Sequence, residues 1–497
     1  MAGREPLGRV SFGRISFWGH LAEPKLSSHL LTGDGWGRVA LVASGPMPGL
    51  LTRLDLRGMD GDLRSLLPGP TLAGDGPVTA VREILDAVKE GGDAAVIELT
   101  KRFDGVEPSS LRVPAEEIEA AGVAVPEVLR DALEEAARAI RQFHEAERAA
   151  HRGFEHVGED GISTRELLVP VSRAGCYAPG GRAPLASSVL MTAVPARVAG
   201  VGEVVLCSPP GPDGKVSAPV LAAAAVAGVD EVYAIGGAQA VAAMAYGTAT
   251  VRPVEVIAGP GNLYVATAQR LVAGDGLVGV PSAFAGPSEV VVVADNSAPA
   301  SYAAVDLVVQ AEHGPDGLSW LVTWSEEVAA AVEEEVERLV AASPRQREIR
   351  STLERGGWSV LVDGPAQAIG VCNVVAPEHL ELITAEPEAL VPLVRSAGAV
   401  FCGPWAPASV GDYVAGPSHV LPTARSARFS SALGTDDFLK RVHVVSLGRE
   451  ALTKVAPRVA ALAEAEGLAA HALSVLSRTG LTPTGQARSE TAAPSVR

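Results

Sequence analysis

The sequence has few cysteines, no excess of basic residues and no long run of large apolar residues. Its four cysteines are widely spaced and form no C-x-x-C motif, which disfavours a cysteine-bound metal. We therefore expect them as small buried hydrophobic residues in a reducing cytosol: Cys176, Cys207, Cys372 and Cys402. The formal net charge of −17 at pH 7 disfavours a nucleic-acid partner, because a phosphate-binding face needs clustered Lys and Arg.

Membrane insertion is also disfavoured. The uncharged run at residues 232–251 is long enough to span a bilayer, but it contains Gly236, Gly237 and Gln239 and is poor in Leu, Ile and Phe. It is more typical of a strand, a Gly-Gly turn and a helix. The N-terminus lacks a compact apolar stretch followed by a small-residue cleavage site, so we expect a cytoplasmic protein with no membrane partner.

The two ends of the chain differ from its middle. Residues 1–46 are rich in Gly, Ser and Pro and follow no hydrophobic period, so we interpret them as a disordered extension. Residues 479–497 are rich in Ser, Thr, Ala and Pro and are interpreted as a disordered tail. The chain between these ends is long enough for two or three domains.

The middle of the chain reads first as helices and then as alternating strands and helices. Residues 76–151 have mostly helical periodicity, with one long helix that Pro126 opens. After residue 201 short apolar strands alternate with helices, which is typical of a buried parallel sheet. We predict these strands at residues 203–207, 231–235, 255–258, 289–294, 319–324, 358–362 and 399–402. Helical periodicity returns from about residue 449 to 477.

This pattern predicts an α/β fold with two incomplete Rossmann-like parallel sheets and a small C-terminal helical segment. We place the first α/β domain at residues 47–170 and 286–430, and the second at 171–285. Residues 431–478 are the helical segment.

The loops beside the predicted strands are unusually rich in Gly and Pro. They lie at residues 236–239, 259–262 and 285–289. In open α/β sheets, ligands bind beyond the carboxyl ends of strands, and glycine lets backbone amides approach a phosphate. The full G-x-G-x-x-G fingerprint is absent, so the residues leave open both a nucleotide site and ordinary turns.

Four polar residues form a set of nitrogen and oxygen ligands: Gln310, His313, Asp412 and His471. Such a set suits Zn²⁺, with Mn²⁺ or Co²⁺ also possible. Gln310 and His313 share one face of a predicted helix, Asp412 lies in a predicted loop, and His471 lies on the C-terminal helix. A single His is more often structural, and Gln is not a usual zinc ligand, so the pattern alone does not decide between a metal site and separate residues.

Glu378 and His379 form an adjacent acid and imidazole, which is equipment for proton transfer. Pro377 indicates that the two residues begin a helix. The positive end of that helix would disfavour the imidazolium form of His379 and keep it a free base. A first-turn carboxylate with no catalytic role remains an alternative for Glu378.

Eight ordered motifs between about residue 51 and residue 478 resemble the histidinol dehydrogenase family. They are Y-A-P-G-G-R-A-P-L-A-S-S-V-L-M at 177–191, G-G-A-Q-A at 236–240, G-P-G-N at 259–262, A-G-P-S-E at 285–289, Q-A-E-H-G-P-D at 310–316, A-P-E-H-L-E at 376–381, G-D-Y-V-A-G-P-S-H-V-L-P-T at 411–423 and E-G-L-A-A-H at 466–471.

The resemblance implies that L-histidinol is oxidised through the aldehyde to L-histidine, with two NAD⁺ reduced. Glu378 and His379 would be the catalytic pair. One zinc per subunit would be held by Gln310, His313, Asp412 and His471. The substrate would contact Ser288, Gln310, His313, His379, Asp412, His419, Glu466 and His471. NAD would contact Tyr177, Gln239 and Asn262.

The resemblance also implies a homodimer in which Glu466 and His471 serve the partner's active site. Two departures from the family pattern stand outside these positions: the acidic stretch at residues 434–438 and His443, where a hydroxyl residue is more common. Residues 1–46 have no counterpart in the family core.

Three other functions were weighed. A sister dehydrogenase acting on another small diol or amino alcohol would share the metal and Glu-His motifs, but Glu466 and the intact loop at residues 416–423 favour histidinol. The Gly-rich β-α-β block argues against a zinc hydrolase that uses Glu378 to activate water. A non-catalytic binding protein ranks last, because every chemical group needed for catalysis is present. The choice between NAD and NADP stays open, since no acidic residue can be assigned to the ribose.

Overall fold

The computed structural model describes residues 49–59, 61–68, 76–180, 184–281, 288–312, 314 and 317–480. These residues belong to one compact unit that spans Leu41–Arg497. The predicted extension at 1–46, the predicted tail apart from Thr479 and Gly480, and His313 lie outside the described residues.

The larger parallel sheet has six strands in the order β1-β10-β9-β8-β11-β12. Its bounds are β1 Thr52–Asp55, β8 Glu289–Ala294, β9 Leu318–Thr323, β10 Gly357–Leu361, β11 His379–Ile383 and β12 Ala399–Cys402. Strand β8 is almost all valine because both of its faces are covered. Val290 and Val292 pack in the hydrophobic core on one side of the sheet, whereas Val291 and Val293 pack in the core on the other side.

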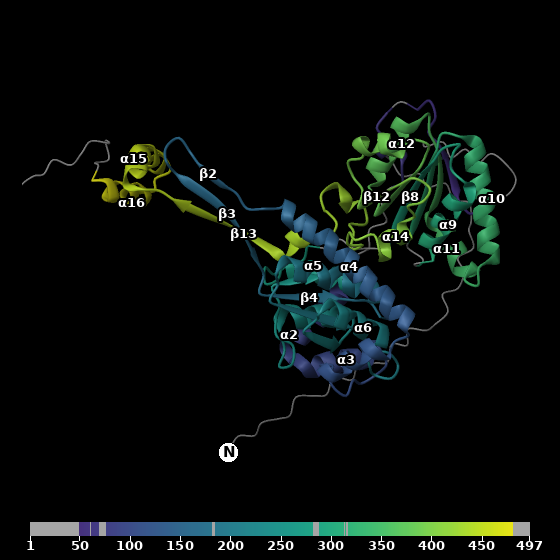
Figure 1. Cartoon of the computed structure of the whole chain (residues 1–497), viewed down its shortest axis with the longest axis horizontal. Helices are drawn as coiled ribbons and strands as arrows, with labels where there is room; N and C mark the ends of the chain where they lie inside the picture. The colour runs from purple at the N-terminus through teal and green to yellow at the C-terminus, as the bar shows by residue number, and fades with distance from the viewer. Residues whose placement is uncertain are drawn as a thin grey trace, which may run out of the picture. The chain divides into compact units, whose positions relative to one another are not determined.

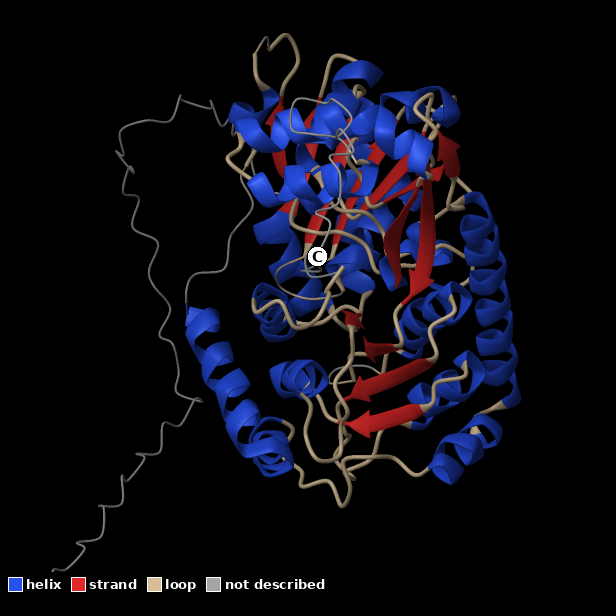
Figure 2. Ribbon diagram, turned by 90° about the vertical axis from the view of Figure 1, so that its left-hand side faces the viewer, coloured by secondary structure: helices blue, strands red, loops and turns tan. Residues whose placement is uncertain are grey.

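Helices cover both faces of this sheet (Figure 2). The core on one face includes residues of α9 Ala300–Ala311, α10 Glu326–Ala342 and α11 Gln346–Gly356. The core on the other face includes residues of α12 Pro365–Val375 and α13 Pro387–Leu390, with α1 Leu63–Leu66 against it. Burying one valine side chain contributes about 1.5–3 kcal/mol, so the apolar strands hold this layered arrangement together.

The second parallel sheet has four strands in the order β6-β5-β4-β7. Its bounds are β4 Arg173–Tyr177, β5 Glu203–Ser208, β6 Glu231–Ala234 and β7 Val256–Ala258. One face packs on α3 Ala115–Ala124, α4 Glu127–Ala150, α5 Ala186–Ala199 and α6 Ala218–Ala227. The other face packs on α2 Gly76–Phe103, α7 Gly237–Tyr246 and α8 Leu263–Gly274.

Helices α2, α3 and α4 therefore share their cores with the second sheet. Residues 47–170 had been predicted to belong to the domain of the first sheet. Helical periodicity shows which side of a helix is apolar, but it does not show which sheet that side meets.

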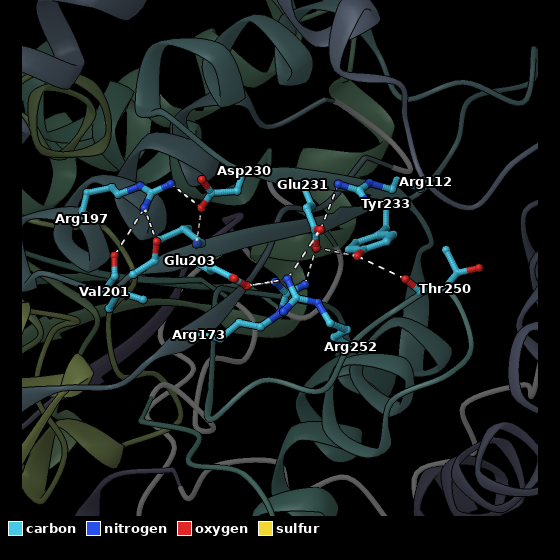
Figure 3. Close-up of polar contacts among 12 residues, drawn as sticks. Arg112, Arg173, Arg197, Val201, Glu203, Asp230, Glu231, Tyr233, Thr250 and Arg252 are labelled. Atoms are coloured by element: carbon cyan, nitrogen blue, oxygen red, sulfur yellow. Dashed lines mark hydrogen bonds and ion pairs between the residues drawn. The ribbon is translucent and has the colours of Figure 1, made fainter.

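An ionic network joins the amino ends of three strands of the second sheet (Figure 3). The guanidinium of Arg173 on β4 contacts the carboxylates of Glu203 on β5 and Glu231 on β6. Tyr233 donates its hydroxyl hydrogen to Glu231 at 2.7 Å, and Arg252 contacts Glu203 at 2.6 Å. This network closes the amino edge of the sheet and leaves the carboxyl edge to the glycine-rich loops.

A third, antiparallel sheet was missed by the sequence analysis (Figure 1). Strand β13 Leu439–Ser446 pairs with β3 Ser163–Pro170, and β3 pairs with the short strand β2 Glu155–Val157. Lys440, Arg441 and His443 interrupt any apolar alternation in β13, so its sequence gives little sign of a strand. The predicted C-terminal helices follow as α15 Arg449–Ala465 and α16 Ala469–Thr479.

The predicted α/β class, with parallel sheets and a helical C-terminal segment, is confirmed. Short elements complete the described chain: α14 Ala408–Tyr413, η1 Val391–Leu393, η2 Ser426–Arg428 and η3 Thr435–Phe438. Within the described residues, each helix is too short or too polar to cross a bilayer.

Candidate active site

Glu378 and His379 lie at the start of a strand, so the predicted helix at this position is wrong. Helix α12 ends at Val375, Ala376 adopts a left-handed conformation with φ 49°, and His379 is the first residue of β11. His379 pairs with residues of both β8 and β12. Pairing on both sides of an apolar strand outweighs the local helix-starting preference of Pro377.

Hydrogen bonding orients the imidazole of His379. Its Nδ1 atom lies 3.2 Å from the backbone carbonyl of Glu289. Since a carbonyl only accepts hydrogen bonds, Nδ1 carries a hydrogen, and Nε2 is the nitrogen that gains or loses a proton. The Nε2 atom lies 3.5 Å from Oδ1 of Asp412. The titrating nitrogen of a buried histidine therefore faces the side of the site where Asp412 lies.

The pKa of His379 is raised to about 9, which is opposite to the direction expected from a helix N-terminus. Burial by itself lowers this pKa, but the carboxylates of Glu378 and Asp412 outweigh it. Beside these two carboxylates the imidazole is therefore protonated at neutral pH, and Nε2 acts as a base once it has lost that proton.

Glu378 is held by the backbone and side chain at the start of β8. The backbone N–H of Glu289 donates to its Oε2 at 3.0 Å, and its carboxyl also forms a hydrogen bond with the side chain of Ser288. Glu378 is only 7% exposed, and burial raises the pKa of its carboxyl. Its Oε2 lies 3.6 Å from Nδ1 of His379. The pair is therefore a buried carboxyl and an imidazole that are both held by the backbone of one residue, Glu289.

Glu289 supplies that anchor, although the sequence analysis did not single it out. Its N–H binds Glu378 and its carbonyl binds His379. Its own carboxyl is buried and accepts from the N–H of Ala424 at 3.0 Å, and burial raises its pKa to about 8. The quoted motif A-G-P-S-E ends on this residue, so the signal was present, but its main contribution is made by backbone atoms that a motif cannot reveal.

Asp412 lies in the short helix α14 and not in a loop. Its backbone carbonyl accepts from Nδ1 of His419 at 2.9 Å, and Nε2 of His419 lies 3.2 Å from the hydroxyl of Ser188 on α5. His419 therefore links α14 to the helix that follows the Tyr177 loop. Ser188 was part of a quoted motif but had not been assigned a place at the site.

Gln310 lies near the end of α9 with an unpaired amide. It is 5% exposed, and its Nε2 has no hydrogen-bond partner among the described residues. A Cβ atom built on Gly317 would lie 3.5 Å from the carbonyl oxygens of both Gln310 and Ser288, so these two backbones are neighbours. Buried amides are normally paired, and an unpaired one points to an absent ligand.

These contacts join six of the predicted site residues into one neighbourhood: Gln310, Ser288, Glu378, His379, Asp412 and His419. The neighbourhood lies at the amino ends of β8 and β11, since Glu289 and His379 are the first residues of these strands. This edge is opposite to the carboxyl strand ends beyond which open α/β sheets usually bind ligands.

The three predicted NAD contacts lie at the carboxyl edge of the second sheet. Tyr177 ends β4, and its hydroxyl accepts from the N–H of Gly237 at 3.1 Å. Gln239 is 1% exposed, and neither polar atom of its amide has a partner among the described residues. Asn262 caps α8, with its side-chain oxygen accepting from Tyr264 N–H at 3.0 Å. Gln239 is therefore the residue of this group with an unused polar side chain.

Glu466 and His471 belong to the C-terminal helical segment. Glu466 ends α15, and His471 is an exposed residue of α16 whose N–H donates to the Leu468 carbonyl at 3.0 Å. The described residues include no group of three or more His, Cys, Asp or Glu side chains that could hold a metal ion. The four predicted zinc ligands are thus not assembled by the described residues of one chain.

Comparisons with known proteins show the family of this chain. The family model for histidinol dehydrogenase matches residues 73–479. A histidinol dehydrogenase from Parasynechococcus marenigrum is 48% identical over 80% of this chain and 89% of its own length. One from Thermobifida fusca is 44% identical over 87% of this chain and 98% of its own length.

The fold matches as well. The crystal structure of histidinol dehydrogenase from Elizabethkingia anophelis superposes with a TM-score of 0.82 at 32% identity. The match covers 87% of this chain and 99% of that one. This chain therefore belongs to the histidinol dehydrogenase family of oxidoreductases.

Proposed function

We propose that the chain catalyses the four-electron oxidation of L-histidinol through L-histidinaldehyde to L-histidine, the final steps of histidine biosynthesis. Two hydrides leave the same carbon for two NAD⁺, and one water is consumed. The observation that carries this proposal is the buried Glu378-His379 pair, which is held by the backbone of one residue of β8 and faces Asp412. Family membership names the substrate class.

His379 is the proton acceptor of both oxidations. Its Nδ1 hydrogen is committed to the Glu289 carbonyl, so Nε2 takes the hydroxyl proton as the carbon loses its hydride. The same nitrogen takes the proton of the aldehyde hydrate in the second oxidation. Phe401, with its ring centre 6.0 Å from that of His379, adds an apolar wall.

Glu378 activates the water that adds to the aldehyde. Its carboxyl is buried and held in place by Glu289 N–H and by Ser288. Burial raises the pKa of the carboxyl, which strengthens it as a base once it is ionised. Two bases side by side suit a reaction in which an alcohol and a water are deprotonated in turn.

The residues present fit a zinc ion. When bound, zinc would orient the imidazole and amine of the substrate, since both are good zinc ligands. Gln310 brings a buried, unpaired amide, and Asp412 brings a carboxylate beside His379. His313 and His471 complete the proposed ligand set. His471 would come from the partner subunit.

Asp412 and Gln310 would thus hold the ion on the side of the site that Nε2 of His379 faces.

NAD⁺ would bind at the carboxyl edge of the second sheet. Glycine is required at this edge, because a Cβ on Gly259 would lie 2.2 Å from the Tyr177 carbonyl oxygen against which its backbone packs. The free amide of Gln239 offers both a donor and an acceptor to the dinucleotide. The contact between Ser188 and His419 joins this region to the site of proton transfer.

A homodimer would bring Glu466 and His471 to the partner's site. The antiparallel sheet that leads to α15 contains no buried residue, and large apolar side chains of this region are exposed. Val157, Val445, Leu462 and Leu473 are exposed by 61%, 62%, 67% and 58%. Exposed apolar surface of this kind is typical of a protein interface, and two-fold pairing is its commonest form.

A spectrophotometric assay tests the proposal directly. The purified full chain is incubated with L-histidinol and NAD⁺, and NADH absorbance is followed before and after chelation and zinc replacement. We expect two NADH per L-histidine formed, loss of turnover on chelation and recovery with Zn²⁺. An active chain that releases the aldehyde after one NADH, or that prefers another amino alcohol, would contradict the proposed substrate and stoichiometry.

A further inference from the structure

Glu381 is a buried carboxyl close to the catalytic pair that has no role in the chemistry above. It lies two residues after His379 on β11, so both side chains point to the same face of the sheet. It is 1% exposed. Its Oε1 accepts a hydrogen bond of 2.7 Å from the backbone N–H of Ala408.

Ala408 is the first residue of α14, the helix that carries Asp412. The bond to Ala408 therefore ties the amino end of that helix to the strand of His379. It also satisfies one of the backbone N–H groups that a helix start leaves unpaired. In this way Glu381 connects the two elements that bring Nε2 of His379 within 3.5 Å of Asp412.

Glu381 also lies beside Asp306 on α9, because the charge of the Asp306 carboxyl acts on that of Glu381. Burial, together with this charge, raises the pKa of Glu381 to about 9. The Oε2 atom of Glu381 is buried and has no hydrogen-bond partner among the described residues. Asp306 lies one helical turn before Gln310 and shares its face of α9.

We infer that Glu381 is a positioning residue that holds β11, α9 and α14 together so that His379, Gln310 and Asp412 converge. This inference rests on the proposed function, because it concerns the same site. The two neighbours of Glu381 lie on the helices that carry Gln310 and Asp412: Asp306 is on α9 and Ala408 is on α14. A carboxyl pair at this depth costs desolvation energy that an apolar side chain would avoid. Bringing His379, Gln310 and Asp412 together is a reason to keep a carboxyl at this position despite that cost.

Two variants of Glu381 separate geometry from charge. Glu381→Gln preserves the acceptor for Ala408, because the amide oxygen can accept from its N–H, and it places a neutral group beside Asp306. Glu381→Ala removes this acceptor. With L-histidinol and NAD⁺ we expect kcat of Glu381→Ala to fall by about 10- to 100-fold, as a misplacement near 1 Å can do. Glu381→Gln should stay within about threefold of the unchanged chain, and the KM for NAD⁺ should stay the same in both.

A backbone variant tests the link to α14 without changing a core side chain. Ala408→Pro removes the N–H that donates a hydrogen bond to Glu381, and the first turn of a helix tolerates proline. The preceding residue already has the extended backbone that proline requires, with Pro407 at φ −68° and ψ 152°. Ala408→Ser retains the N–H and is the matched control. We expect Ala408→Pro, but not Ala408→Ser, to lower kcat and to weaken zinc retention measured by competition with a chelator.

The outcomes are distinguishable from failure of the proposed function. If the unchanged chain does not oxidise L-histidinol, the proposed function fails, and zinc retention still compares the variants. If the unchanged chain is active, Glu381→Ala within twofold of it overturns the inference, as does Glu381→Gln losing as much as Glu381→Ala. Should Glu381→Ala not fold, Ala408→Pro behaving like Ala408→Ser in both kcat and zinc retention overturns it.

Discussion

Nε2 of His379 lies 3.5 Å from Oδ1 of Asp412, although one residue opens strand β11 and the other lies in helix α14. The Nδ1 hydrogen of His379 is committed to the carbonyl of Glu289 on β8. The geometry therefore fixes the hydrogen on Nδ1, and it directs the titrating nitrogen Nε2 toward a carboxylate proposed to bind metal.

The first prediction concerns the division of labour between Glu378 and His379. His379→Ala should slow both oxidations by about 10²–10⁴-fold, the usual contribution of a general base. Glu378→Gln should slow oxidation of supplied L-histidinaldehyde more than formation of the aldehyde from L-histidinol, because only the later stage needs activated water. Single-turnover NADH formation with each substrate measures both effects. Equal and small losses with both substrates would contradict the assignment.

The second prediction concerns metal binding by Gln310. The amide of Gln310 is buried, its Nε2 has no hydrogen-bond partner among the described residues, and a cation would bind this amide through its oxygen. Gln310→Ala should lower zinc affinity by roughly tenfold or more, the loss seen even when supporting groups around a metal are removed. Metal content after dialysis against a chelator measures this. Gln346→Ala, at an exposed position on α11, is the control. Equal zinc content in both variants would remove Gln310 from the ligand set.

The third prediction concerns sharing of the site between subunits. A chain carrying Glu378→Gln and His379→Ala should be inactive, as should a chain carrying His471→Ala. After subunit exchange, one site of the mixed dimer combines an intact pair with an intact His471. An equal mixture should then recover about a quarter of the normal activity, since half of the dimers are mixed. No recovery despite demonstrated exchange would mean that each chain supplies its own His471.

The fourth prediction concerns Asp437, in the acidic stretch that departs from the family pattern. Burial raises its pKa from 3.8 to about 6, even though Gly434 N–H donates to its carboxyl at 2.7 Å. Because the folded pKa lies above the unfolded one, the stability from this group is fully present below about pH 4 and is lost as pH rises through 6. This loss amounts to roughly 2–3 kcal/mol at most.

Asp437→Asn keeps an acceptor for Gly434 but does not titrate. The melting temperature of this variant relative to the unchanged chain should therefore rise between pH 4 and pH 7. A difference that stays constant across this range would show that Asp437 does not titrate as described.

The fifth prediction concerns the ionic network at the amino edge of the second sheet. Arg173 has a side chain only 8% exposed and bridges two strands through Glu203 and Glu231. Arg173→Ala leaves buried Glu231 with less compensation and should cost about 3–5 kcal/mol of unfolding free energy. Arg252→Ala removes a 61% exposed member of the same network and should cost no more than about 1 kcal/mol. Urea unfolding compares the two, and equal losses would contradict the importance of burial.

Much of the architecture could be read from the sequence, because local pattern and burial agree in most elements. The valine run of β8 predicts a strand covered on both sides, and the strand spans Glu289–Ala294 as expected. Helix α6 occupies Ala218–Ala227, within the predicted alternation of strands and helices. In such elements the hydrophobic period alone selects the secondary structure, and packing only confirms it.

Tertiary structure decided three other points. The segment after Pro377 is a strand, since β8 and β12 pair with it on both sides. Strand β13 exists because β3, far away in the sequence, provides its hydrogen-bond partners. The roles of Glu289 and Glu381 depend on backbone groups and on side chains from other elements.

The sequence by itself therefore determined the family, the α/β class and the residue types of the site. Only the tertiary structure decided which of these residues meet, at which edge of the sheet they lie, and which hydrogen of His379 is committed. The physical reason is that periodicity reports which side of an element is apolar, whereas convergence depends on contacts between elements that are distant in the chain.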